Sequence, residues 1–215
     1  MARQVFQEAN QQLCAALEEA GCRARPITSG VLQAVRPPPL PAPAALAPPA
    51  HHSAAVEQEV LDENIGFVGE ISGMNTAPLH AAIEADCLPL LLPLAESASG
   101  QILNVNADVV AREAAIRMSP LKTVFINSKG GWVTTKQDEP HAPAGQKLAR
   151  IYMAEHYEEM AARDYEGRQG TLLKLNELKL ILDHLPPPAS IALTSAEGLV
   201  KELFAHRGVG TTVTH

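Results

Sequence analysis

The chain has 215 residues, of which 46% are hydrophobic and 19% are charged, and its formal net charge at pH 7 is -7. This composition is typical of a globular protein with one sizeable core or two small ones. The negative net charge argues against nucleic acid or an anionic membrane surface as the main partner. The apolar run at 87–95 is far shorter than the roughly 20 residues that a membrane-spanning helix needs.

The first predicted element is a helix at residues 4–20, where apolar residues recur at four-residue steps along one stripe. The stripe consists of Val5, Ala9, Leu13 and Leu17. Gly21 is expected to end this helix. Residues 23–35 combine β-branched residues with Pro and Gly, and they predict a short strand and a turn.

Residues 36–52 are rich in proline and alanine. Such a composition predicts a solvated, extended loop that contributes little to a core. The segment is either a proline-motif ligand for a partner protein or a variable surface insertion, and its composition favours the insertion.

From residue 64 onward, predicted strands and helices alternate. Strands are expected within 64–75, 87–95, 122–127, 186–194 and 209–215, and helices within 76–86, 106–118, 145–162, 170–185 and 196–208. Loops are expected at 96–104 and, as a loop or hairpin, at 128–135. The alternation predicts an α/β fold, a three-layer α/β/α sandwich with a mainly parallel central sheet.

Three cysteines, Cys14, Cys22 and Cys87, form no CxxC pair. Their odd number and spacing argue against a disulfide framework or a thiolate zinc site, and they favour a reducing compartment. The sequence therefore assigns no metal-ligating residues.

A parallel sheet binds ligands beyond the carboxyl ends of its strands, and two polar segments follow predicted strands there. The first carries Asn104, Asn106 and Asp108 before a predicted helix. Asn and Asp at such a place commonly cap the helix, which would account for one or two of the three. The remaining side chain is then available to a ligand, and the residues alone leave both interpretations open.

The second segment reads Asn127-Ser-Lys-Gly-Gly131, directly after a predicted buried strand. Glycines allow a backbone to approach a ligand closely, but they also make tight turns. The spacing matches neither a Walker loop nor a dinucleotide fingerprint.

Lys174 stands among leucines in the predicted helix at 170–185. A lysine in this setting usually extends its ammonium group to solvent. It can also neutralise charge that develops on a transferred phosphoryl group. From the helix alone, the first interpretation is favoured.

Several long motifs in order give a stronger signal than any single residue. The segments LAESASGQILNVNADVVAREAA, LKTVFINSKGGW, EHYEEMAARDYEGRQGTLLKLNELKLILDHLP and ELFAHRGVGT resemble the amino-acid kinase family, and specifically its acetylglutamate kinases of the fungal mitochondrial type. ALEEAGCRARPITSGV and VGEISGMN are similar to the same proteins. The resemblance covers nearly all of 4–213 apart from the Pro/Ala-rich insertion.

The resemblance implies the amino-acid kinase fold and a reaction in arginine biosynthesis, in which ATP with Mg²⁺ phosphorylates the side-chain carboxylate of N-acetylglutamate. By the family's motifs, Asn104 binds acetylglutamate, with Asn106 as a second substrate-binding candidate. Asp108 orients the catalytic lysines, and Lys174 stabilises the transferring phosphoryl group. These residue types suit a reaction between two anions, which depends on positioning and on neutralising charge.

The resemblance also implies nucleotide contacts at Asn127, Ser128 and Gly131, and an arginine-inhibition site that includes Glu202 and Gly208. It implies the mitochondrial matrix and a homo-oligomeric full-length protein. The alternative is the kinase-like domain of an acetylglutamate synthase, which senses arginine without phosphorylating a substrate.

The family's first phosphate loop, rich in Lys and Gly, has no counterpart in the sequence. A second Gly-rich loop and a substrate-binding arginine segment are also missing from the 215 residues. We therefore expect 1–215 to be a single partial amino-acid kinase domain that is incomplete at its N-terminus. The chain would lack one of the two catalytic lysines that Asp108 orients.

The first prediction is that the isolated chain does not catalyse phosphoryl transfer, because charge neutralisation and the phosphate cradle are incomplete. A colorimetric acyl-phosphate trapping assay with ATP and N-acetylglutamate measures this. Robust turnover by the isolated chain would contradict the prediction.

Overall fold

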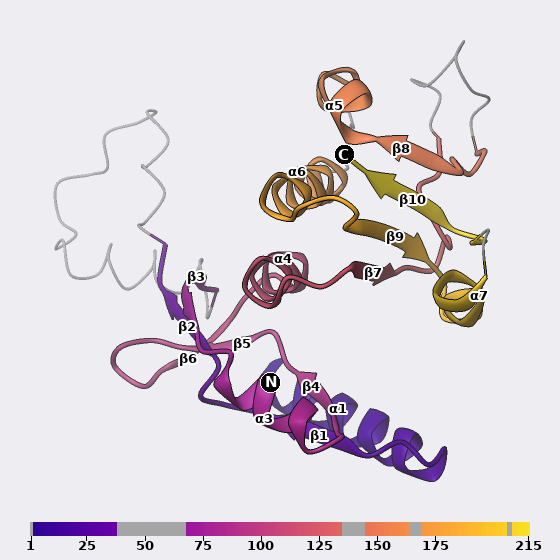
Figure 1. Ribbon diagram of the computed structural model, residues 1–215. Helices are drawn as coiled ribbons and strands as arrows, with labels where there is room; N and C mark the ends of the chain where they lie inside the picture. The colour runs from indigo at the N-terminus through magenta and orange to yellow at the C-terminus, as the bar shows by residue number, and fades with distance from the viewer. Residues whose placement is uncertain (1, 38–67, 135–144, 164–168, 206–207) are drawn as a thin grey trace, which may run out of the picture. The chain divides into compact units, whose positions relative to one another are not determined.

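Figure 1 shows the computed structural model, which describes all residues except 1, 38–67, 135–144, 164–168 and 206–207. The chain divides into two compact units, Met1–Val110 and Ala111–His215. Among the described residues, the first unit contains two sheets and the second contains one. The Pro/Ala-rich segment predicted at 36–52 lies outside the described residues from residue 38 onward.

The described residues of the first unit form two helices, a two-stranded sheet and a four-stranded sheet. Its elements are α1 (Ala2–Glu19), β1 (Ala24–Ile27), β2 (Leu32–Val35), β3 (Glu70–Met74), α3 (Ala77–Glu84), β4 (Leu88–Leu91), β5 (Leu94–Glu96) and β6 (Ile102–Asn104). β1 and β4 pair in parallel. The other sheet has the order β3-β2-β5-β6, with β2 and β5 parallel and the outer pairs antiparallel.

Helices α1 and α3 end in the same way. Gly21 has φ 83° and Asp86 has φ 55°, the left-handed conformation common at helix ends. The N–H groups of Gly21 and Cys22 donate to carbonyls of the last turn of α1, and those of Asp86 and Cys87 do the same for α3. Both turns lead directly into the parallel pair β1 and β4. The predicted end of the first helix at Gly21 is confirmed.

Two details of the first unit differ from the sequence prediction. The apolar run at 87–95 is not one strand but is divided between β4 and β5, which belong to different sheets. Pro93 lies between them and has no N–H for a continuous ladder, although its carbonyl accepts a bond from the N–H of Val105. The loop predicted at 96–104 ends earlier, because β6 pairs with β5 as a hairpin.

The apolar stripe predicted on α1 is largely uncovered by the described residues. Val5 and Leu13 are 57% and 51% exposed. Ala9 is exposed and Leu17 is half-buried, while the polar Asn10 is buried. The helical period was therefore predicted correctly, but it did not identify the face that packs.

The second unit is built on one four-stranded sheet. Its elements are α4 (Ala107–Met118), which begins in the first unit, β7 (Lys122–Ile126), β8 (Arg150–Tyr152), α5 (Met153–Ala161), α6 (Gln169–His184), β9 (Ser190–Thr194), α7 (Leu199–Phe204) and β10 (Thr211–Thr214). The strand order is β7-β9-β10-β8. β7 and β9 are parallel, as are β10 and β8, whereas β9 and β10 are antiparallel. The arrowheads in Figure 1 accordingly point one way for β7 and β9 and the other way for β10 and β8.

The core of the second unit lies between α6 and this sheet. The buried face of α6 consists of Leu175, Leu178, Ile181 and Leu182, each at most 1% exposed. They share a core with Ile191, Leu193 and Val213 of the central strands. Burying each such side chain contributes about 1.5–3 kcal/mol, so this face fixes the helix on the sheet.

The helix predicted over 145–162 is wrong in its first half. Residues 146–152 are not helical and include β8, and the helix α5 begins only at Met153. Leu148 donates its N–H to Trp132 O at 2.9 Å, and β8 pairs with β10. These tertiary hydrogen bonds outweigh the local helical spacing of Leu148 and Ile151. The α/β class is confirmed, with sheets that are rich in parallel pairs.

The second prediction concerns two threonines that are both 0% exposed, Thr194 and Thr211. The Thr211 hydroxyl accepts the N–H of Trp132 at 2.8 Å and donates to Leu148 O. The Thr194 hydroxyl has no hydrogen-bond partner among the described residues. Thr211→Val should lower the free energy of unfolding by about 1–3 kcal/mol, because a buried N–H loses its acceptor. Thr194→Val should change it by less than about 0.5 kcal/mol or raise it.

Urea unfolding followed by the fluorescence of Trp132, the single tryptophan of the chain, measures both values in the unit that contains the threonines. Equal losses for the two valine variants would show that these hydrogen bonds do not decide the difference.

Candidate functional site

The loop after β7 is shaped by the side chain of Asn127. Its Oδ1 accepts the N–H of Gly131 and its Nδ2 donates to Gly131 O, both at 3.3 Å. The N–H of Gly130 donates to the Asn127 carbonyl at 3.2 Å, and the N–H of Asn127 donates to Thr194 O of β9 at 2.8 Å. Asn127 therefore acts as the clamp of the loop, and Ser128 lies exposed near its tip.

A second loop, at residues 195–198, lies against the first one. A Cβ built on Gly130 would stand 3.5 Å from the Cβ of Ser195. The Ser195 hydroxyl accepts the N–H of Gly198 at 3.3 Å. The pKa of Glu197 is lowered, first by a hydrogen bond from its own backbone N–H and then by one from the Ser195 hydroxyl. The two loops meet at the carboxyl ends of the parallel strands β7 and β9, the place where α/β sheets bind ligands.

Lys174 lies on α6 and is half-buried. Its Nζ stands 5.1 Å from the ring centroid of Phe125 on β7, a cation–π distance. Side chains two residues apart on a strand share a face, so Phe125 and Asn127 face the same way where β7 remains extended. The ammonium group of Lys174 is thus held near the end of β7, rather than only extended into solvent.

The polar residues at 104–108 belong to the first unit, and they divide into a cap and a ligand candidate. Asn106 Oδ1 accepts the N–H of Asp108 at 2.8 Å and that of Val109 at 3.4 Å, so it caps α4. Asp108 is half-buried in the first turn of this helix, where a negative charge is favourable. Asn104 Oδ1 is buried without a hydrogen-bond partner among the described residues.

Glu202 and Gly208, predicted for an arginine site, lie in contact in the second unit. Glu202 is 2% exposed, and its carboxylate accepts bonds from Lys122 Nζ at 3.2 Å and from the N–H of Gly210 at 3.3 Å. Lys122 Nζ also donates to the Glu202 carbonyl at 2.5 Å. A Cβ on Gly208 would collide with the Glu202 carboxylate, which explains the glycine. The carboxylate is therefore already paired in this structure.

The structure thus brings together Asn127 and Gly131 in one loop, with Lys174 near the same strand, and brings together Glu202 and Gly208. Asn104, Asn106 and Asp108 lie in the other unit. The roles predicted for all these residues remain predictions.

The model of the amino acid kinase family matches residues 1–192 of the chain. The chain belongs to the amino acid kinase family. The fold agrees with that of solved structures. An isopentenyl phosphate kinase structure has a TM-score of 0.62 at 14% identity, over 98% of this chain and 66% of that one.

Relatives with known names are more similar to the chain in sequence than this solved structure is. The "Protein arg11, mitochondrial" of Schizosaccharomyces pombe is 39% identical over 215 residues, 100% of this chain and 21% of that protein. An "Acetylglutamate kinase" of Xylella fastidiosa (strain 9a5c) is 35% identical over 98% of this chain and 42% of that protein. The chain therefore spans about a fifth to two fifths of the length of these relatives.

A structure of N-acetylglutamate synthase from Neisseria gonorrhoeae complexed with coenzyme A and N-acetyl-glutamate has a TM-score of 0.73. That structure is 17% identical in sequence to this chain, over 100% of this chain and 43% of that one. At this identity the likeness shows the fold alone.

Two features of the second unit were missed by the sequence analysis. Lys147 lies along the loop of Asn127, opposite Val133 in an antiparallel bridge. A search for an antiparallel partner of the predicted loop or hairpin at 128–135 would have been the signal for it. Arg112 of α4 pairs with Glu177 of α6 at 2.9 Å, and Glu177 is 4% exposed. No pattern within either helix indicated this pair.

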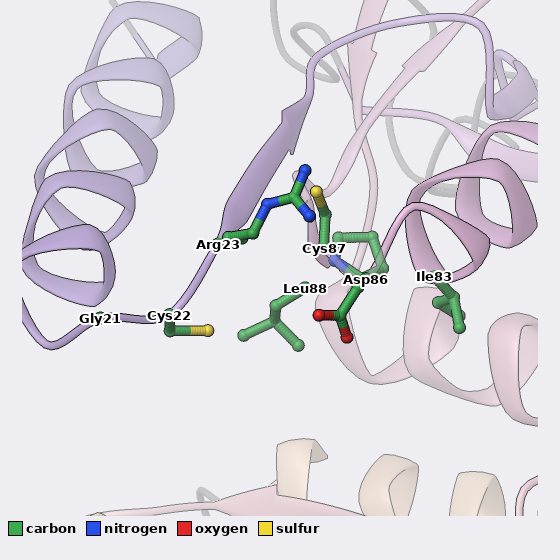
Figure 2. A pocket seen from close by; sticks show the side chains of 8 residues that line it. Gly21, Cys22, Arg23, Ile83, Asp86, Cys87 and Leu88 are labelled. Carbon is green, nitrogen blue, oxygen red and sulfur yellow. The ribbon is translucent and has the colours of Figure 1, made fainter.

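Figure 2 shows a cavity of about 660 Å³ in the first unit, and its lining includes none of the predicted site residues. It is lined by Gly21, Cys22, Arg23, Ile83, Asp86, Cys87, Leu88 and Pro89. In Figure 2 the Arg23 and Cys87 side chains extend in the same direction, whereas the Cys22 thiol and the Asp86 carboxylate extend in other directions. The two thiols are therefore not directed at each other, and the cavity is no paired-thiol site.

In the part of the chain that the structure describes, no three His, Cys, Asp or Glu side chains gather as a metal site. The same residues include no helix that is long and apolar enough to cross a membrane.

The third prediction compares two lysines of the second unit. Lys122→Met leaves the buried Glu202 carboxylate without its ammonium partner and should lower the free energy of unfolding by roughly 3 kcal/mol. Lys179 pairs with Asp183 at 2.6 Å, but this pair is partly exposed to solvent and lies within one helix. Lys179→Met should therefore cost less than about 1 kcal/mol.

Denaturant unfolding monitored by Trp132 measures both values. Adding Glu202→Gln to Lys122→Met should restore part of the loss, because the uncompensated buried charge is removed. No recovery in this double variant would count against the ion pair as the cause.

Proposed function

We propose that the chain carries the residues of an acetylglutamate kinase, which transfers the γ-phosphoryl group of ATP to the side-chain carboxylate of N-acetylglutamate in arginine biosynthesis. The observation that carries the proposal is the likeness along 98–100% of the chain to mitochondrial fungal proteins of arginine-related name and to bacterial proteins named acetylglutamate kinase. Because the chain spans only part of these relatives, the activity is proposed for the site that these residues build.

The nucleotide is proposed to bind at the carboxyl ends of β7 and β9. There the clamp of Asn127 holds the loop so that the Ser128 and Gly131 region is presented to a ligand. Mg²⁺ would enter with the nucleotide, held mainly by phosphate oxygens, and would neutralise their charge. Lys174, held near the same strand end over Phe125, supplies a fixed positive charge for the transferring phosphoryl group.

Asn104 is the better of the two asparagine candidates for binding N-acetylglutamate. Its buried Oδ1 lacks a partner among the described residues, and an amide N–H of the substrate would satisfy it. Its Nδ2 group can at the same time donate to a substrate oxygen, and the neutral amide adds no charge beside an anionic substrate. The Oδ1 of Asn106 is occupied in capping α4, which leaves only its Nδ2 group for the substrate.

Asp108 is proposed to orient the catalytic lysines. Asp108 lies one turn before Arg112 on α4. Arg112 binds Glu177, which lies about one turn after Lys174 on α6. The Arg112–Glu177 pair therefore limits rotation and sliding of the helix that carries Lys174. Such limits matter because phosphoryl transfer depends on positioning.

The alternative function is arginine sensing without phosphoryl transfer, through Glu202 and Gly208. Glu202 carries the carboxylate that a guanidinium group would need, but this buried group already binds a cation, Lys122, so the alternative has less support. A guanidinium group would have to replace that ammonium group to bind there. The Neisseria gonorrhoeae synthase complexed with coenzyme A and L-arginine supports the shared fold alone, at 18% identity and a TM-score of 0.65.

The names of the fungal relatives support a mitochondrial location, and we propose the mitochondrial matrix. A homo-oligomeric full-length protein and inhibition by L-arginine are proposed from the family resemblance.

The fourth prediction is that isothermal titration calorimetry detects binding of a non-hydrolysable ATP analogue with Mg²⁺ and of N-acetylglutamate to the chain. Asn104→Ala should weaken acetylglutamate binding about tenfold or more, because a hydrogen-bonded substrate group loses its partner. The affinity for the ATP analogue should stay unchanged and serves as the internal control. Binding of arginine without any binding of nucleotide would overturn the kinase proposal in favour of the sensor.

A further inference from the structure

We infer that Lys147 is a phosphate-binding residue of the nucleotide site at the loop 127–131. The inference rests on the proposed nucleotide binding of that loop and extends it to a residue outside the loop. It follows from how the lysine side chain lies on the two glycines.

The stem of Lys147 runs along the backbone of the loop. A Cβ built on Gly131 would stand 2.9 Å from Lys147 Cδ and 3.0 Å from Cγ. A Cβ built on Gly130 would stand 3.2 Å from Lys147 Nζ. The side chain therefore passes over Gly131 and ends over Gly130. Both glycines have positive φ, at 67° for Gly130 and 155° for Gly131, so neither the backbone conformation nor the lysine leaves room for a larger residue.

The ammonium group at the end of this stem is only partly used. Lys147 Nζ donates to Val209 O at 3.3 Å, a single long bond to a neutral carbonyl. An ammonium group has three N–H donors, so two remain for other partners. Among the described residues no carboxylate forms an ion pair with Lys147, and the residue is exposed. A ligand arriving from solvent can therefore reach this charge.

The position of this charge is defined by the two strand ends. Gly130 lies between the ammonium group and Ser195, the first residue after β9. Lys129 is a second exposed cation on the same loop. The nearby anion Glu197 is engaged by its own backbone N–H and by the Ser195 hydroxyl. The N–H groups of Gly130 and Gly131 already donate to Asn127, so the ammonium group over them is the donor left to bind an anion there.

Phosphate is the anion that fits best. Lysine binds phosphate as a compact point charge, and the loop stands where α/β sheets receive ligands. A purely structural role, in which the stem only covers the glycines, is the competing explanation. It predicts that removing the charge while keeping the stem has no specific effect on phosphate.

The fifth prediction uses Lys147→Met, which keeps an unbranched stem and removes the charge. Calorimetry should show that affinity for ATP with Mg²⁺ falls roughly tenfold, the effect of losing one charge-assisted hydrogen bond. Affinity for adenosine, which has no phosphate, should stay the same. ATP binding by the variant should also depend less on KCl concentration than binding by the wild-type chain. Lys147→Arg should retain most of the ATP affinity.

Lys129→Met is the matched control, because it removes another exposed cation of the same loop and changes the net charge equally. Its ATP affinity should change less than about threefold. Equal weakening of ATP and adenosine by Lys147→Met, or unchanged ATP binding, would overturn the inference and leave Lys147 as a packing residue. If the wild-type chain binds neither ATP nor adenosine, the nucleotide function of the loop fails, and the inference fails with it.

Discussion

The burial of one face of α6 against the central strands determines where charge can lie in the second unit. Four aliphatic side chains of this helix are almost fully excluded from solvent. Once that face is fixed, Lys174 is directed toward Phe125 and Glu177 toward Arg112. The apolar face of the helix therefore contributes stability, and the same packing positions the ionic groups along its polar edge.

The carboxyl ends of β7 and β9 gain their shape from short-range hydrogen bonds rather than from large side chains. Asn127 closes one loop and Ser195 closes the other, both through backbone partners. Such loops place few large side chains above the strand ends. That property suits a site where a large polyanion must approach the backbone, and it explains why glycine and serine dominate there.

Much of this arrangement was predictable from the sequence, and the exceptions have physical reasons. Local periodicity located α1, α3, α4 and α6, and the α/β alternation predicted the class. Capping chemistry predicted a cap among Asn104, Asn106 and Asp108 but did not say that it would be Asn106. Local spacing failed at residues 146–152, where bonds to Trp132 and pairing with β10 favour a strand over a helix. It failed again at 87–95, because Pro93 interrupts the ladder in a run that otherwise reads as one strand.

Contacts between distant positions could not be predicted from one sequence. Lys122 and Glu202 are 80 residues apart, and neither has a neighbour in sequence that identifies the other. The same is true of Lys147, which reaches Gly130 and Gly131 from its bridge to Val133. The packed face of α1 also depends on tertiary structure, since the apolar stripe is regular but largely exposed among the described residues.

The twin endings of α1 and α3 have a consequence for how the chain can vary. Gly21 and Asp86 set the length of two turns that feed neighbouring parallel strands, with Ala24 opposite Leu88. One residue inserted into either turn would slide one strand against the other and exchange the faces of its side chains. The two turns are therefore coupled in length, so an insertion in one would need a compensating insertion in the other.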